Sequence, residues 1–318
     1  MKKFAILFAV TLLLAVADLL AVPAEKFIPE QSFAVIRLDV RRLIDLPMPD
    51  NAEKSSQTAH EYLKSFEQIK KEAAAEGIEP LKLFDGDVWI AKTGKEDDDF
   101  AIYFGTLVPE TTLAAFLQKK GFVITTAANR RVYVFQEFAL TYLTADVIML
   151  AKNSDSLPLL ITASQQNNSN PLLSIIDRKS QIAAVINGND LSSRPGKKSK
   201  IKLIKSTLDI DTASTAPLAL IIEAEVHFFK AKDAARQAMQ MQLAVPGMAG
   251  MLLANDEKLM QAVCSGFKVT NQENILNISF GLSGENVQKL LEYVANPANF
   301  PKPQPNSAVP PQETDSKN

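Results

Sequence analysis

The chain of 318 residues is poor in the side chains on which much enzyme chemistry depends. It contains one cysteine, Cys264, two histidines and one tryptophan. A single cysteine excludes an intramolecular disulfide and a paired-thiol redox centre. The sequence also has no Cys-x-x-Cys, no His-Glu-x-x-His and no glycine-rich phosphate loop. We therefore predict a protein that is not an enzyme and needs no cofactor.

The chain also lacks an excess of either charge. It has 34 Lys and Arg against 36 Asp and Glu, a net charge of −2. A dedicated nucleic-acid-binding protein normally carries a clear basic excess, so we expect no nucleic-acid partner. Because 47% of the residues are hydrophobic, the chain can bury a sizeable core.

The longest apolar run, residues 4–16, is too short for a bilayer core, which needs about 20 residues. Lys2 and Lys3 precede it, and small residues ending at Ala24 follow it. This order is typical of a secretory signal peptide, cut after Ala24 or, in the alternative, after Ala17. We expect a bacterial protein exported to the periplasm or beyond, whose mature chain has no transmembrane helix.

Hydrophobic periodicity predicts strands and amphipathic helices grouped in hairpins rather than in a steady alternation. A strand–turn–helix unit recurs at residues 100–120, 218–243 and 275–295. Residues 32–46 also resemble residues 180–194. These patterns predict a duplicated α+β protein of mostly antiparallel sheet with amphipathic helices packed on it. The expected parts are a signal peptide (1–24), a first module (25–178), a second module (179–296) and a disordered Pro-rich tail (297–318).

Within the second module, a strand is expected at residues 218–229 and a helix at 231–243. Pro246 and Gly247 predict a turn before a further helix over 248–263.

The strand at 33–39 and the units 100–120 and 218–243 carry a resemblance. Over residues 30–296 the chain resembles uncharacterised exported bacterial proteins with tandem ferredoxin-like α+β modules. The resemblance implies a non-enzymatic role in the envelope or outside the cell. It brings no catalytic residues.

One candidate metal site lies on the strand at 218–229. Glu223, Glu225 and His227 recur at every second position, so they project from one face. Carboxylates and imidazole bind zinc and other transition metals. The first and last of them lie roughly 13 Å apart along a strand, so a site would need further ligands. The alternative interpretation is the polar face of an amphipathic strand.

Two other segments are candidate contact surfaces. Methionine is flexible and polarizable, which suits a surface that adapts to partners, although it also fills cores. The basic segment 194–205 has no acidic residue and could contact an envelope protein or an anionic surface. The candidate partner-binding residues are Met239, Met241, Met248, Met251, Met260, Lys197, Lys198 and Lys200.

These observations favour a non-enzymatic exported protein that binds or assembles components of the cell envelope. Two alternatives remain at this point. One is a metal-dependent hydrolase using Glu223, Glu225 and His227. The other is a carrier of lipid or lipoprotein, which would need an apolar cavity.

Overall fold

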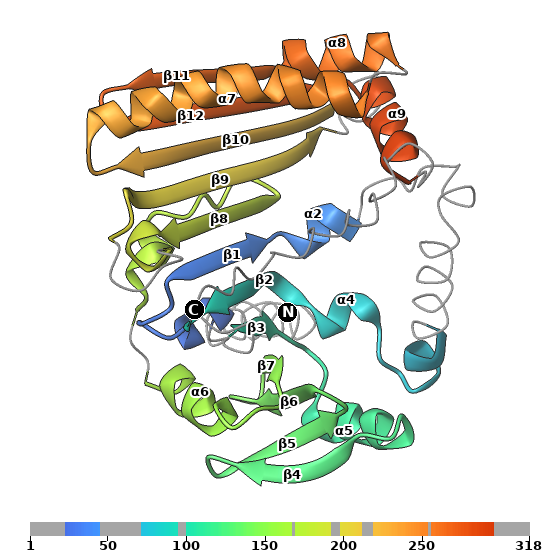
Figure 1. Cartoon of the computed structure of the whole chain (residues 1–318). Coiled ribbons are helices and arrows are strands. Elements are labelled where there is room, and N and C mark those ends of the chain that lie inside the picture. The colour runs from blue at the N-terminus through green and yellow to red at the C-terminus, as the bar shows by residue number, and fades with distance from the viewer. Residues whose placement is uncertain are drawn as a thin grey trace, which may run out of the picture.

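The structure is a computed structural model. It describes residues 23–44, 71–94, 100–166, 169–191, 198–211, 219–253 and 256–295. Within them the chain builds one sheet of 12 strands in which every neighbouring pair is antiparallel (Figure 1). Helices pack on the sheet. The α+β class and the antiparallel sheet predicted from the sequence are confirmed.

The elements before residue 178 provide seven of the strands. They are η1 (Ala24–Phe27), β1 (Ala34–Leu38), α2 (Val40–Ile44), α4 (Pro80–Leu83), β2 (Asp85–Lys92), β3 (Phe100–Gly105), α5 (Glu110–Lys119), β4 (Val123–Ala127), β5 (Arg130–Phe135), β6 (Phe138–Tyr142), β7 (Val147–Lys152), α6 (Leu157–Ser164) and η3 (Pro171–Ser174).

The elements after residue 178 provide the other five strands. They are β8 (Ile182–Asn187), η4 (Gly188–Asp190), β9 (Ile201–Asp211), β10 (Ala219–Phe228), α7 (Ala231–Leu252), α8 (Glu257–Gly266), β11 (Phe267–Gln272), β12 (Ile275–Leu282) and α9 (Gly284–Ala295).

The strand order is β11-β12-β10-β9-β8-β1-β2-β3-β7-β6-β5-β4. β1 pairs with β2 on one side and with β8 on the other. The sheet is therefore continuous across the predicted boundary at residues 178 and 179, and β1 and β8 form the seam. The two strands whose sequences resemble each other are direct neighbours. The proposed duplication itself stays a prediction.

Three clusters of buried side chains hold the helices to the sheet. The largest contains Trp89 and Tyr103 and is closed by η1, α6 and η3. A second contains Phe104 and Ile148 and is covered by α5 through Leu113 and Leu117. The third, around Phe228, Val269 and Leu276, is covered by Ala234 and Ala238 of α7. These small residues let the helix backbone lie close to the strands.

Several boundaries differ from the expectations. Helix α7 runs through Pro246 and Gly247 without a turn and ends at Leu252, and α8 begins at Glu257. The predicted turn there is wrong, because contacts of α7 with β10, β11 and β12 outweigh the local preference of proline to end a helix. Strands β6 and β9 were not expected. Residues 1–22 of the predicted signal peptide, Lys197 and the Pro-rich tail lie outside the described residues.

Candidate functional site

The predicted polar face of β10 lines a groove on the side of the sheet opposite α7. Val226 and Phe228 pack in the cluster under α7, so the alternating residues Glu223, Glu225 and His227 project from the other face. Strands β8 to β12 form a cavity there of about 580 Å³. Its polar lining comprises Asp177, Lys205, Ser206, Thr207, Glu223, Glu225, Lys268, Thr270, Asn277 and Ser279.

The pairing register places these groups in rows across the sheet. Glu225 lies between Lys205 of β9 and Asn277 of β12. Its carboxylate accepts a hydrogen bond from Lys205 Nζ at 3.1 Å and contacts His227 Nε2 at 3.2 Å. The hydrogen bond from Lys205, followed by the contact with His227, holds the pKa of Glu225 below its usual value. Glu225 is therefore a carboxylate at neutral pH.

This arrangement bears on the metal hypothesis. Lys205 Nζ and His227 Nε2 both contact the same carboxylate oxygen of Glu225, so a cation bound to this carboxylate would lie beside the ammonium group of Lys205. Across the part of the chain that the structure describes, no three Asp, Glu, His or Cys side chains come together as a metal-binding group. The groove therefore has the character of a charged, hydroxyl-rich surface.

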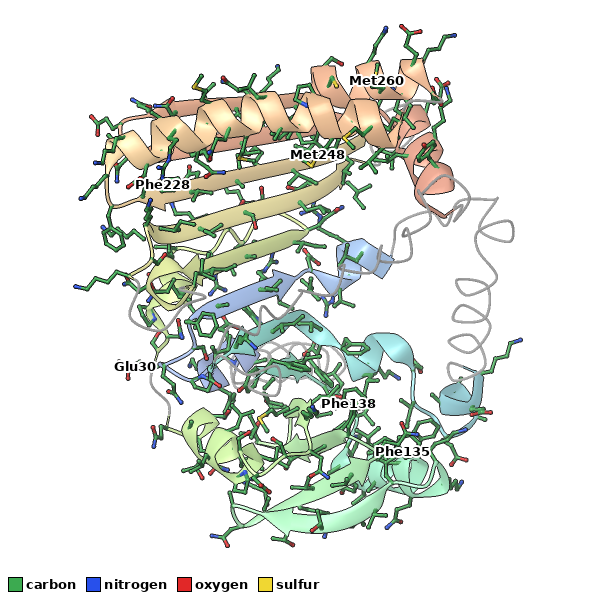
Figure 2. All side chains as sticks on the ribbon, viewed as in Figure 1. Glu30, Phe135, Phe138, Phe228, Met248 and Met260 are labelled. Atoms are coloured by element: carbon green, nitrogen blue, oxygen red, sulfur yellow. The ribbon has the colours of Figure 1, made fainter. Side chains whose placement is uncertain are left out.

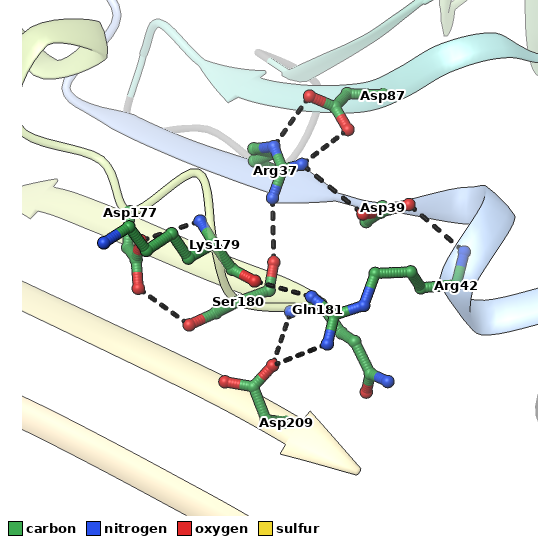
Figure 3. A network of polar contacts seen from close by, with 9 residues as sticks. All are labelled: Arg37, Asp39, Arg42, Asp87, Asp177, Lys179, Ser180, Gln181 and Asp209. Atoms are coloured by element: carbon green, nitrogen blue, oxygen red, sulfur yellow. Dashed lines mark hydrogen bonds and ion pairs between the residues drawn. The ribbon is translucent and has the colours of Figure 1, made fainter. Parts of the chain in front are cut away.

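A buried polar network borders the groove at the seam between β1 and β8 (Figure 3). Arg37, only 5% exposed, donates through Nε and Nη2 to the two carboxylate oxygens of Asp87 at 2.7 and 2.8 Å. Its Nη1 donates to the backbone carbonyl of Ser180 at 2.8 Å. An arginine in the middle of the apolar strand β1 was the sequence signal for this network, and sequence reasoning missed it.

The rest of the network fixes the chain that leads into β8. The Asp177 carboxylate accepts bonds from the Lys179 backbone N–H and the Ser180 hydroxyl, each at 2.8 Å. These bonds, the backbone one foremost, lower the pKa of Asp177. The Gln181 amide exchanges two hydrogen bonds with the backbone of Ile210 on β9. These bonds join β1, β2, β9 and the segment that leads into β8, so the network anchors the sheet.

The second candidate site is the outer face of α7, which is unusually apolar. The small residues Ala234 and Ala238 face the sheet together with Met241, and several other large apolar side chains of the helix are exposed. We call these exposed side chains the α7 surface. They are Met239 (65% exposed), Leu243 (70%), Met248 (53%), Met251 (83%) and Leu252 (44%).

The α7 surface continues into a small apolar cavity where α7, α8 and α9 meet, and Met248 lies at this end of the helix (Figure 2). The cavity measures about 230 Å³. Met248 and Leu252 belong both to the α7 surface and to its wall. The remaining lining residues are Val245, Ala249, Leu253, Val263, Leu290 and Tyr293.

The structure separates the predicted contact residues into two groups. Met239, Met248 and Met251 are exposed on α7, whereas Met241 packs against the cluster under the helix and Met260 is half-buried in α8.

Lys198 and Lys200 of the basic segment are exposed. Lys200 Nζ lies 3.6 Å from a carboxylate oxygen of Asp233 in the first turn of α7. One end of the basic segment is thus close to the start of the methionine-bearing helix.

The comparisons with known proteins give distant structural likeness only. Two crystal forms of TP0453 superpose with TM-scores of 0.47 and 0.46, at 11% and 9% sequence identity. They cover 86% and 89% of this chain and 98% and 99% of their own. No family model matches the chain, and no curated protein matches it. The ferredoxin-like character of the modules stays a prediction.

None of the described helices combines the length and the hydrophobicity needed to cross a membrane.

Proposed function

We propose that the protein is a non-enzymatic, exported binding or assembly protein of the bacterial cell envelope, and that it captures a partner protein on the α7 surface. The observation that carries this proposal is the set of large apolar side chains that α7 leaves exposed. Small alanines contact the sheet, while Leu243 and Met251 are 70% and 83% exposed. Contiguous exposed apolar side chains of this kind mark contact sites in proteins.

The size of the neighbouring cavity indicates what kind of partner fits. Sites that enclose a small organic ligand usually measure about 300–1,000 Å³. The cavity beside Met248 holds about 230 Å³, and its lining is almost entirely apolar. It is large enough for one or two apolar side chains of a protein, and too small for the acyl chains of a lipid. The lipid-carrier alternative is therefore less well supported than a protein partner.

Methionine makes this surface adaptable. Its unbranched side chain and polarizable sulfur can fit apolar groups of different shapes. Burying one such side chain contributes about 1.5 kcal/mol, or roughly tenfold in affinity. We therefore expect that changing either Leu243 or Met251 to glutamine weakens partner binding by about tenfold.

The test is capture of partners by the tagged protein from cross-linked cells of its own source, compared among variants. Leu243→Gln and Met251→Gln alter the α7 surface. Leu159→Gln is the matched control, because Leu159 is a similarly exposed leucine (74%) on another helix, α6. The proposal expects a reproducible envelope protein that the control captures as well as the unchanged protein does, and that the two α7 variants capture in clearly smaller amounts.

Partners that all three variants retain would overturn the assignment of the surface. A partner-free protein carrying bound lipid would instead support the carrier alternative. Metal that stays bound through purification would return attention to Glu223, Glu225 and His227.

A further inference from the structure

The two edges of the sheet differ in how they are protected. Strand β11 forms one edge, lies in contact with α7 and carries Lys268. Strand β4 forms the other edge and contacts α6, yet all of its residues except Ala127 are exposed. Its sequence is Val-Ile-Thr-Thr-Ala, and residues 121–129 contain no charge. Soluble proteins normally protect an edge with charges, proline, a bulge or a covering element.

The hairpin that joins β4 to β5 determines which backbone groups are free. Ala128 and Asn129 form a two-residue connection, and both have positive φ, 47° and 59°. In such a hairpin the flanking pair Ala127–Arg130 is hydrogen-bonded, and every second pair along the ladder repeats this bonding. The N–H and C=O groups of Thr125 therefore point toward β5. Those of Ile124 and Thr126 point toward the open edge.

We propose that β4 is a self-association edge, at which a second copy of this chain adds its own β4 in antiparallel orientation. A two-fold axis through Thr125 places Ile124 opposite Thr126 of the second copy, and Thr126 opposite its Ile124. Each pair then exchanges both outward backbone bonds. The contact is isologous, so it closes as a dimer.

Other two-fold registers leave more of the outward-pointing N–H and C=O groups of Ile124 and Thr126 without a hydrogen-bond partner. An axis at Ile124 would pair Thr126 with Phe122, whose N–H already donates to the Leu117 carbonyl at 3.0 Å. An axis at Thr126 would pair Ile124 with Ala128, which lies in the turn with positive φ. The axis at Thr125 is the register that pairs both free residues within the strand.

The side chains are compatible with this register. Thr125 faces its own copy across the axis, and Val123, 66% exposed, lies beside Ala127 of the second copy. Ile124 lies beside Thr126. Pairs of β-branched residues directly opposite each other favour antiparallel sheets, and no like charges meet. The contact area is small, so we expect a weak, concentration-dependent dimer.

Charge reversal on the axis tests the register. The Thr125 side chain is exposed, so Thr125→Lys and Thr125→Asp leave the monomer intact. Each variant sets two like charges opposite each other, and should weaken its own dimer at least tenfold. An equal mixture should dimerise again, because Lys then faces Asp. Sedimentation velocity of the purified protein, from about 1 μM to several hundred micromolar, measures this.

Two further variants serve as controls. Thr126→Pro removes an outward N–H and no bond to β5, so it should abolish the dimer without unfolding the chain. Thr270→Lys changes an exposed threonine on the other edge strand, and should leave the dimer unchanged. A protein that is monomeric throughout the concentration range would overturn the proposal. So would a dimer that survives Thr125→Lys, or variants whose mixture fails to associate.

Discussion

Replacing Arg37 with methionine tests whether the buried network stabilises the seam of the sheet. Methionine keeps an unbranched apolar side chain but removes the guanidinium group. Asp87 then loses both of its hydrogen bonds, at 2.7 and 2.8 Å, and the Ser180 carbonyl loses its donor. Breaking a buried ion pair by removing one partner costs about 3–5 kcal/mol.

How far the Arg37 and Asp87 side chains are exposed to water determines where in the range of about 3–5 kcal/mol the cost falls. The Arg37 side chain is 6% exposed, but that of Asp87 is 25% exposed, so water can replace part of what the carboxylate loses. We therefore expect a loss of about 3 kcal/mol in the free energy of unfolding. For a chain of this size the melting temperature should fall by about 5 °C. Asp87→Asn alone should cost about 2 kcal/mol.

Urea unfolding monitored by Trp89 fluorescence is the assay. Trp89 is the only tryptophan, is 1% exposed and is the direct cross-strand partner of Arg37. The double variant R37M/D87N should lose about 2 kcal/mol less than the sum of the single losses, since the two side chains stabilise each other. Arg41→Met is the control, because its ion pair with Asp85 at 2.9 Å is exposed and contributes under about 1 kcal/mol. Additive single losses, or an R37M loss as small as that of the control, would refute the reasoning.

Two further predictions concern single positions. The pKa of Asp177 is lower in the folded than in the unfolded chain, so its carboxylate stabilises the fold at neutral pH, and this contribution disappears as the pH falls through the folded-state value. Asp177→Asn should therefore lower the free energy of unfolding by about 1 kcal/mol at pH 7, and by progressively less below about pH 4. Urea midpoints measured across this pH range test the prediction. An equal loss at both ends of the range would contradict it. Pro246→Ala restores a backbone N–H inside α7 and should raise the free energy of unfolding by about 1–2 kcal/mol. Calorimetry measures this change. A lower melting temperature would show that proline is required at this position.

The sequence was sufficient to locate a helix or strand where that element carries a strong pattern of its own. Alternation of polar and apolar residues identified the strand expected at 218–229, which is β10. The strand–turn–helix unit expected at residues 100–120 contains β3 and α5, and Gly121 after this helix has a positive φ of 86°. These signals are local, so they survive in a single sequence.

The sequence was insufficient to locate an element or to orient its side chains where contacts between distant segments determine the structure. Strand β9 follows a basic segment, and its pairing with β8 and β10 cannot be seen from its own residues. The methionines of α7 were candidate contact residues, but the sequence left their orientation open, because large apolar side chains usually face a sheet. Here Ala234 and Ala238 occupy that position, which leaves Met239 and Met251 outside.

The central place of β1 has a consequence for how the chain folds. Most neighbouring strands in the sheet are close in sequence and can pair while the chain is still short. The seam is different, since the bond from Arg37 to the Ser180 carbonyl joins residues 143 positions apart. The chain must close this long loop before β1 can join the two halves, and such closure is slow and entropically costly. Among the described strands β1 is synthesised first, yet its second neighbour, β8, emerges much later. Until β1 and β8 pair, the facing edge of each strand is open to pairing with other chains.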